Sequence, residues 1–161
     1  KNKQWGKVAL SAIKCHPKEA GGKMLGQYPH NIDAKGRLVF PTKLREELGD
    51  SFIVTKGLDN CLFVYSEQAW AELEKKIAAL PMSKSRDLQR FFFSGAANCE
   101  VDAQGRILLP NHLREYADLK KEVYVLGVSG RAEIWNADRW REYSQGVTAE
   151  AAAEAMDELG F

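Results

Sequence analysis

The sequence predicts an α+β fold built from two tandem copies of one short unit. The phrase "DAKGRLVFPTKLRE" at residues 33–46 recurs as "DAQGRILLPNHLRE" at residues 102–115, with eight of fourteen residues identical. The β-rich runs "FIVTKG" and "CLFVY" after the first phrase have counterparts in "VYVLG" and "AEIW" after the second. Each copy is followed by residues with the apolar spacing of a helix. A period near 70 residues is too long for a solenoid repeat, so we expect a duplication.

The alignment of the two copies shifts once along the chain. The repeated phrases lie 69 residues apart, whereas Ile53 and Val123 and the residues after them lie 70 apart. One residue is therefore inserted in the second copy between "LRE" and the next strand. The copies span roughly residues 27–70 and 97–140.

Each copy predicts the same order of elements. A short strand leads into Asp-x-x-Gly-Arg, which has turn chemistry because Asp bonds its own backbone and Gly accepts a positive φ. The apolar triplet "LVF" or "ILL" predicts a short buried strand. A proline then suits the start of a short helix, which in copy one is closed by Gly49. A hairpin follows, with its turn at "LDN" or "VSGR".

Helices are expected after and between the copies. Ser66 can cap a helix that Pro81 stops, and Ser83 can cap "KSRDLQRFFFSG", whose aromatic residues suit core packing better than a stacking platform for single-stranded nucleic acid. Asn136 and Thr148 can cap two further helices. The last, "TAEAAAEAMDEL", has only Met156 and Leu159 as large apolar residues, so its narrow packing face is suited to a neighbouring subunit.

Charge is divided unevenly along the chain. The formal net charge is +1, but six Lys and one Glu lie in residues 1–23, which leaves 17 basic and 21 acidic residues in 24–161 and a net charge of −4 there. Bulk charge thus argues against a nucleic-acid binder, although residues 30–45 are locally basic. Met24 stands where an initiator is expected, and "KEAGGKM" can be back-translated to a ribosome-binding site. We therefore expect residues 1–23 to be a leader outside the fold.

The turn arginines are the candidates for DNA contact. Folding accounts for the Asp and Gly of each turn, but no turn type requires Arg after its Gly. An arginine at the edge of a short turn can offer its fork to phosphate or to the O6/N7 edge of guanine. We take Arg37 and Arg106 as the readers, with Lys35 and Lys43 as further DNA-binding residues, against the alternative of solvated neighbours.

Two other arginines, Arg45 and Arg114, lie in the short helices. Pairing with the next Glu or with the turn Asp of the same copy is at least as good an interpretation for them as DNA contact. Cysteines and histidines are scattered, and there is no phosphate loop and no Cys-x-x-Cys. We expect no catalytic residue, no metal, no cofactor and no small-molecule substrate. Three cysteines far apart suit a reducing cytoplasm, and no apolar run is long enough to span a membrane.

These phrases, with "GLDNCLFVY", "RFFFSGA" and "GVSGRAEIW", resemble the tandem AbrB-type (SpoVT-AbrB) half-domains of the MraZ family of bacterial transcriptional regulators. The resemblance covers residues 24–161. It implies two tandem AbrB-type swapped-hairpin β units that form an intrachain pseudo-dimer with flanking helices. The divisions would be a leader at 1–23, a first half with its following helix at 24–80, a second half with its preceding helix at 81–145, and a C-terminal helix at 146–161.

The resemblance also implies a function. Members of the family bind short direct repeats in double-stranded DNA upstream of the division and cell-wall gene cluster, as ring-shaped homo-oligomers, and often repress it. The expected location is the cytoplasm, in association with the nucleoid. The family's DNA-contacting arginine would fall on Arg37 and on its copy Arg106. The alternative is an AbrB-type protein-interaction module, similar to an antitoxin, without promoter-specific regulation.

Overall fold

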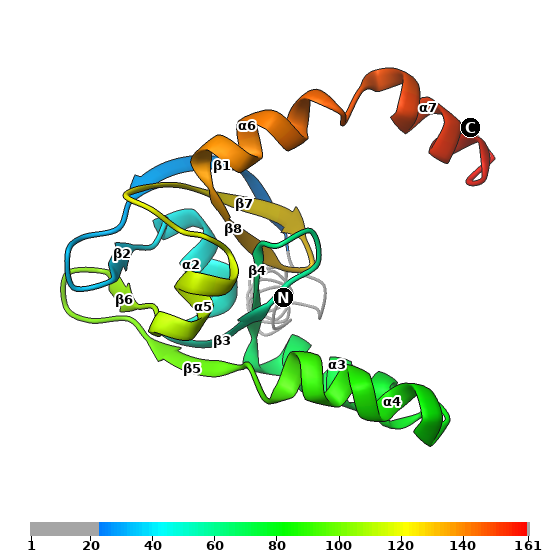
Figure 1. The fold of residues 1–161 in the computed structure, drawn as a ribbon, viewed down its shortest axis with the longest axis horizontal. Helices are drawn as coiled ribbons and strands as arrows, with labels where there is room; N and C mark the ends of the chain where they lie inside the picture. Colours follow the sequence, from blue (N-terminus) through cyan, green and yellow to red (C-terminus); the bar gives the residue numbers. More distant parts are fainter. Residues whose placement is uncertain (1–22, 161) are drawn as a thin grey trace, which may run out of the picture.

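The computed structural model describes residues 23–160 and has the predicted α+β class (Figure 1). Its strands are β1 (Met24–Asn31), β2 (Arg37–Val39), β3 (Ser51–Lys56), β4 (Leu62–Ser66), β5 (Ala97–Glu100), β6 (Arg106–Leu108), β7 (Glu122–Ser129) and β8 (Ala132–Asn136). Its α-helices are α2 (Thr42–Leu48), α3 (Glu67–Ala78), α4 (Met82–Leu88), α5 (Asn111–Tyr116), α6 (Ala137–Gln145) and α7 (Ala149–Asp157), and a π-helix η1 (Gln89–Phe93) follows α4. The expectation of a leader falls almost wholly outside the described residues.

Strands of the two copies are interleaved in one antiparallel sheet of order β1-β7-β8-β4-β3-β5. β1 of the first copy pairs with β7 of the second, and β5 of the second copy pairs with β3 of the first. The short strands β2 and β6 form a separate two-stranded sheet, and Leu38 of β2 also bridges to Ile32. Each copy therefore completes its sheet with a strand from the other, and neither copy closes alone.

The pairing between copies has internal two-fold symmetry. In the β2–β6 ladder Leu38 lies opposite Ile107, its own counterpart at the offset of 69. In the β4–β8 ladder Phe63 lies opposite Glu133, its counterpart at the offset of 70. Equivalent residues thus face each other at both crossings, as a two-fold relation requires.

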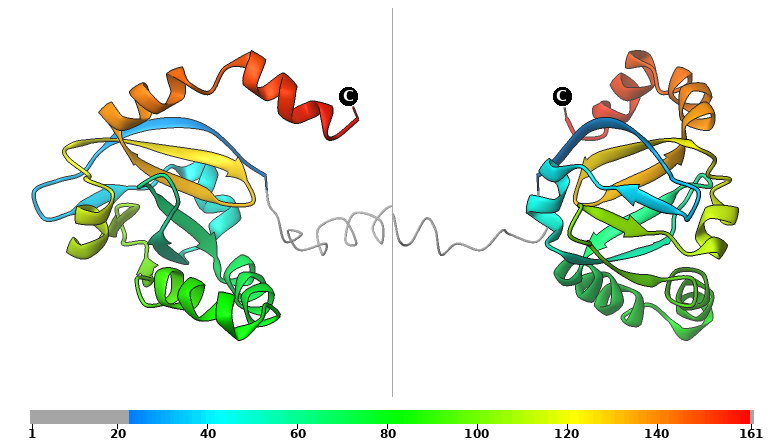
Figure 2. Two further views of the ribbon diagram at one scale, coloured as in Figure 1. Left: turned by 45° about the vertical axis from the view of Figure 1, so that its right-hand side comes forward. Right: turned by 90° about the vertical axis from the view of Figure 1, so that its left-hand side faces the viewer.

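The sheet buries a different apolar set on each face. One face packs against α2, α5 and the β2–β6 pair, with fully buried side chains from all of them: Leu38, Phe40, Leu44, Ile107, Leu109 and Leu113. The other face packs under α3, η1 and α6, and includes Phe63, Ile77, Phe92 and Trp135. The aromatic run "RFFF" lies in this second cluster, which confirms core packing for it. Figure 2 shows the helical segment that carries the run, in green, on one side of the sheet.

Most local expectations hold. The side chains of Ser66, Asn136 and Thr148 each accept a backbone N–H at the start of their helices, and Gly49 ends α2 with φ 83°. The expectation for Ser83 is wrong. α4 begins at Met82 after Pro81, without a side-chain cap, because the fixed φ of the proline already sets the helical entry.

The two helical arms lie on opposite sides of the molecule. Figure 1 shows α6 and α7 on one side and α3 and α4 on the other, with the β2–β6 pair at the end of the molecule away from both arms. We call this the looped end, because it carries residues 33–37 and 102–106, the two predicted turns. No helix within residues 23–160 has the length and hydropathy of a membrane span.

Candidate nucleic-acid interface

The fold brings the two Asp-x-x-Gly-Arg turns side by side at the looped end. The β2–β6 ladder joins them directly, with Arg37 opposite Leu108 and Val39 opposite Arg106. Beyond the ladder, the Gly36 carbonyl accepts from the Leu109 N–H and the Gly105 carbonyl from the Phe40 N–H, both at 3.0 Å. Two turns that lie 69 residues apart in the sequence are therefore neighbours in space.

Within the first turn, Asp33 organises both backbone and side chain. Its Oδ1 accepts from the backbone N–H groups of Lys35 and Arg37, each at 2.9 Å, and its Oδ2 accepts from Arg37 Nε at 2.7 Å. The Arg37 backbone N–H is the largest cause that lowers the pKa of Asp33 below its usual value, and the Arg37 side chain adds to it. The carboxylate thus holds the guanidinium by Nε and leaves its terminal Nη groups for other acceptors.

The second turn repeats this geometry with one difference. Asp102 accepts from the backbone of Gln104 and Arg106 and from Arg106 Nε, all at 2.9 Å, and its pKa is lowered for the same first cause, the Arg106 backbone N–H. Here, however, Arg106 Nη2 also donates to Gln104 Oε1 at 3.2 Å. Arg106 therefore has fewer donors left than Arg37, whose neighbour is Lys35.

The pairing also corrects the sequence argument about these arginines. We expected that folding would not account for Arg37 and Arg106, yet each one forms an ion pair with the Asp of its own turn. The alternative considered for Arg45 and Arg114, pairing with that same Asp, is wrong. The turn Asp is occupied by the arginine four residues later, which is the closer side chain.

Arg45 and Arg114 instead pack under the turns of the opposite copies. A Cβ built on Gly36 would lie 2.8 Å from Arg114 Cζ, and one on Gly105 would lie 3.3 Å from Arg45 Nη2. Both glycines also have positive φ, 84° and 78°. Each turn therefore needs glycine for two reasons, its own backbone and the guanidinium beneath it. Spacing in the sequence gave no sign of this cross-copy contact.

The outer face of the β2–β6 pair exposes residues that the sequence argument placed in the core. Val39 and Leu108 are 45% and 60% exposed, whereas their neighbours in the sequence, Leu38 and Ile107, are fully buried. The prediction of a wholly buried triplet is therefore wrong for the middle residue of each copy. Burial alternates along residues 37–40 and 106–109, as in a half-exposed strand, but three consecutive apolar residues did not reveal it in the sequence.

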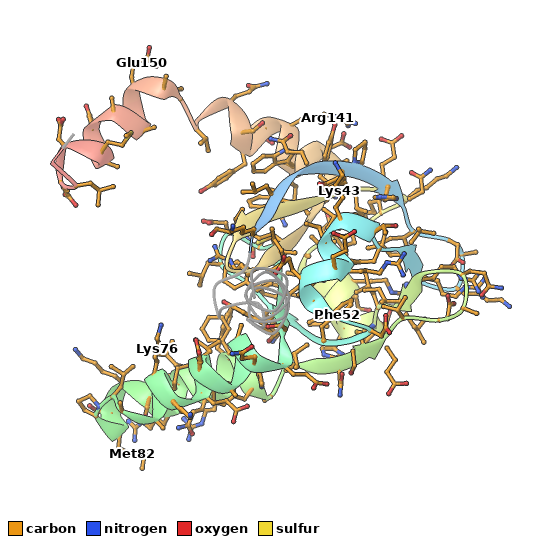
Figure 3. The ribbon with its side chains drawn as sticks, turned by 180° about the vertical axis from the view of Figure 1, so that it is seen from behind. Lys43, Phe52, Lys76, Met82, Arg141 and Glu150 are labelled. Atoms are coloured by element: carbon orange, nitrogen blue, oxygen red, sulfur yellow. The ribbon has the colours of Figure 1, made fainter. Side chains whose placement is uncertain are left out.

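The four predicted DNA-binding residues are not all in one place. Arg37, Lys35 and Arg106 belong to the two adjoining turns, and Lys35 is exposed. Lys43 is exposed on α2, and Figure 3 shows it set back from the looped end. The structure thus groups three of the four.

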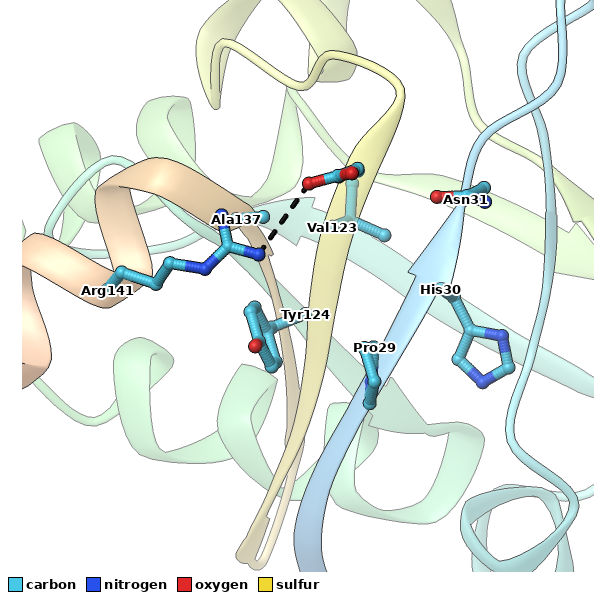
Figure 4. A pocket seen from close by; sticks show the side chains of 8 residues that line it. Pro29, His30, Asn31, Val123, Tyr124, Ala137 and Arg141 are labelled. Carbon is cyan, nitrogen blue, oxygen red and sulfur yellow. Dashed lines mark ion pairs between the residues drawn. The ribbon is translucent and has the colours of Figure 1, made fainter.

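Other candidate chemistry in residues 23–160 is weak. Burial raises the pKa of the Cys99 thiol to about 11 and raises that of Cys61 further, so neither thiol is a nucleophile at neutral pH. No cluster of three His, Cys, Asp or Glu side chains in this range could hold a metal. A hollow of about 250 Å³ beside β1 and β7 includes Arg141, but Arg141 pairs with Asp138 at 3.0 Å and Glu122 at 3.6 Å (Figure 4). Its charge is therefore already balanced.

Comparison with known proteins decides the family. The family model described as "MraZ protein, putative antitoxin-like" matches the chain twice, over residues 24–91 and 92–159. The chain belongs to the MraZ family. The MraZ-family relative from Desulforamulus reducens, named "Transcriptional regulator MraZ", is 58% identical over 83% of this chain and 94% of its own length.

Two further relatives carry the same name. The protein of Moorella thermoacetica is 58% identical over 82% of this chain and 95% of its own, and that of Acetivibrio thermocellus is 54% identical over 84% and 98%. These MraZ relatives are named as regulators and not as enzymes, in agreement with the sequence analysis. A solution structure from Pyrococcus horikoshii aligns at a TM-score of 0.32 and 15% identity over 66% of this chain and 92% of that one, too low to bear on the fold.

Proposed function

We propose that this chain is a sequence-specific regulator of transcription that binds double-stranded DNA through its looped end. The observation that carries the proposal is the pair of adjoining turns whose arginines are each fixed by an aspartate through Nε. Membership of a family whose relatives are named transcriptional regulators supports it. An arginine already held in one orientation loses less freedom when it meets DNA, so more of its contact energy goes into affinity.

The β2–β6 pair has the shape to enter the major groove, which admits a two-stranded ribbon. Arg37 and Arg106 are diagonal neighbours on one face of this ribbon, about 7–8 Å apart in an ordinary antiparallel pair. That separation corresponds to about two base-pair steps of 3.4 Å. Their free Nη groups then meet acceptors on nearby base pairs or phosphates, and Lys35 adds a phosphate contact.

Val39 and Leu108 give this ribbon an apolar part. They lie opposite Arg106 and Arg37 on the same exposed face. Apolar side chains in the major groove contact the thymine methyl group. A face that alternates arginine with an aliphatic residue therefore favours a mixed sequence of G·C and A·T pairs over either alone.

The finer points of the proposal come from the family resemblance. The DNA would be short direct repeats upstream of a division and cell-wall gene cluster that includes the chain's own promoter, and the effect would be repression. The two interleaved copies would act as an AbrB-type pseudo-dimer, and several chains would form a ring. Multivalent contact through a ring allows each chain to bind weakly, which fits the net charge of −4 outside residues 1–23.

A titration of labelled promoter DNA tests the proposal. The fragment upstream of the chain's own gene is compared with a shuffled fragment of the same composition at 50 and 200 mM salt. We expect clear preference for the promoter fragment and, for three cationic contacts per chain, about 40-fold weaker binding at the higher salt. Equal binding of both fragments would instead favour the protein-interaction alternative, to which the "antitoxin-like" part of the family description also points.

A further inference from the structure

No residue of the C-terminal helix α7 is buried against the rest of residues 23–160. Every residue of α7 is exposed, and Figure 1 shows it projecting beyond the sheet. A nine-residue helix is marginal in water by itself, because nucleation costs more than so few hydrogen bonds return. A surface outside residues 23–160 is therefore needed to stabilise it.

The sequence of α7 indicates which chemical properties that surface must have. Ala149, Ala152, Ala153 and Met156 recur at the spacing of one helix face, and Leu159 continues it; Met156 is 43% and Leu159 is 73% exposed. The opposite face carries Glu150, Glu154, Asp157 and Glu158. Residues 142–160 contain five acidic and no basic side chains. The occupant must offer a small apolar patch bordered by positive charge.

The second arm of the chain carries such a patch. Residues 75–86, which we call the basic tip, include Lys75, Lys76, Lys84 and Arg86 and no acidic residue. They join the end of α3 to the start of α4 and expose Leu80 at 39% and Met82 at 74%. Two exposed apolar side chains and four cations within residues 75–86 complement the apolar face and the acids of α7.

The two surfaces lie too far apart to meet within one chain. They belong to arms on opposite sides of the molecule, and Figure 3 shows Glu150 and Met82 at its two extremes. We propose that α7 of one copy docks on the basic tip of a second copy. The contact is heterologous, because each copy gives one surface and receives the other, and repetition of such a contact closes a ring or extends a filament. The inference deepens the ring assembly of the proposed function and rests on it in that respect.

Two variants, each lacking one surface, test the contact by complementation. The first, Met156→Glu with Leu159→Glu, removes the apolar face of α7, and the second, Leu80→Glu with Met82→Glu, removes that of the basic tip. We expect sedimentation to show each alone at the 18.1 kDa mass of one chain and a mixture of the two as a 1:1 complex of twice that mass. Leu58→Glu, at a leucine 57% exposed between β3 and β4, is the matched control and should assemble as the wild type does.

Several results would overturn the contact. They are a wild-type chain that sediments as a monomer, a first variant that still assembles, or two folded monomeric variants that do not pair when mixed. Because all substituted side chains are at least 39% exposed, circular dichroism should show each variant folded, with any loss of helical signal limited to that of α7. Assembly is measured without DNA. Arg37→Ala run in parallel therefore separates the two proposals, since normal DNA binding by that variant would refute the DNA contact while leaving this interface intact.

Discussion

Replacing Arg37 by alanine removes one guanidinium from the looped end and leaves the backbone of the first turn intact. The turn is held by backbone N–H groups of residues 35 and 37 that donate to Asp33, and these do not depend on the arginine side chain. A bidentate arginine contact with guanine contributes about 1–3 kcal/mol, so affinity for the promoter fragment should fall about 5- to 150-fold. If the contact is to phosphate, the salt dependence should also weaken, by about 0.9 in the slope of log K against log salt.

The variant also exposes a carboxylate. Without Arg37, the charge of Asp33 faces the DNA unpaired, and adding Asp33→Asn to Arg37→Ala should restore part of the lost affinity. Arg90→Ala is the matched control, since Arg90 also pairs with an aspartate, Asp87 at 3.2 Å, but lies in η1 and in neither turn. Fluorescence anisotropy with promoter and shuffled DNA measures all of these. Arg106→Ala should cost less than Arg37→Ala, and wild-type affinity and salt slope in both turn variants would refute the assignment.

Three further predictions concern stability. Gly36→Ala forces a side chain into φ 84° and against a guanidinium, so thermal melting should fall by several degrees. A melting temperature equal to that of the wild type would contradict this packing. Because the pKa values of Asp33 and Asp102 are lowered by folding, their stabilisation is present above the unfolded value near pH 4 and is lost as pH falls through the folded values. Melting temperature from pH 6 to 3 should therefore drop less in the double Asn variant than in the wild type. Leu113→Ala empties a fully buried site under the sheet and should cost about 2–5 kcal/mol in urea unfolding; a change below 1 kcal/mol would contradict the packing.

The order of elements could be predicted because it depends on interactions between residues close in the sequence. Turn residues, prolines and capping side chains act within four residues, so Ser66 and Asn136 could be identified without knowledge of the fold. The exchange of strands could not. β1 shows the same pattern whether it pairs with β3 or with β7, since the choice depends on contacts about 100 residues away.

The candidate site was predictable to the same extent. The turn arginines stand out because two copies repeat them, but the position of Arg114 beneath Gly36 arises only when the copies interleave. The exposure of Val39 likewise could not be predicted before the fold was known. An apolar triplet between turns satisfies both a buried and a half-exposed strand, and the β2–β6 pair decides between them by leaving one of its faces uncovered.

Unequal halves give the proposed DNA complex a direction. The fold places Arg37 and Arg106 symmetrically, but Lys35 leaves Arg37 with its terminal donors and an added cation, whereas Gln104 takes one donor from Arg106. A symmetric unit would suit a palindrome, because reversing it on the DNA would cost nothing. A unit with one stronger half binds in a single orientation. Chains joined head to tail, α7 to basic tip, would then present the stronger half at regular intervals with the same polarity, and direct repeats are the DNA arrangement that matches it.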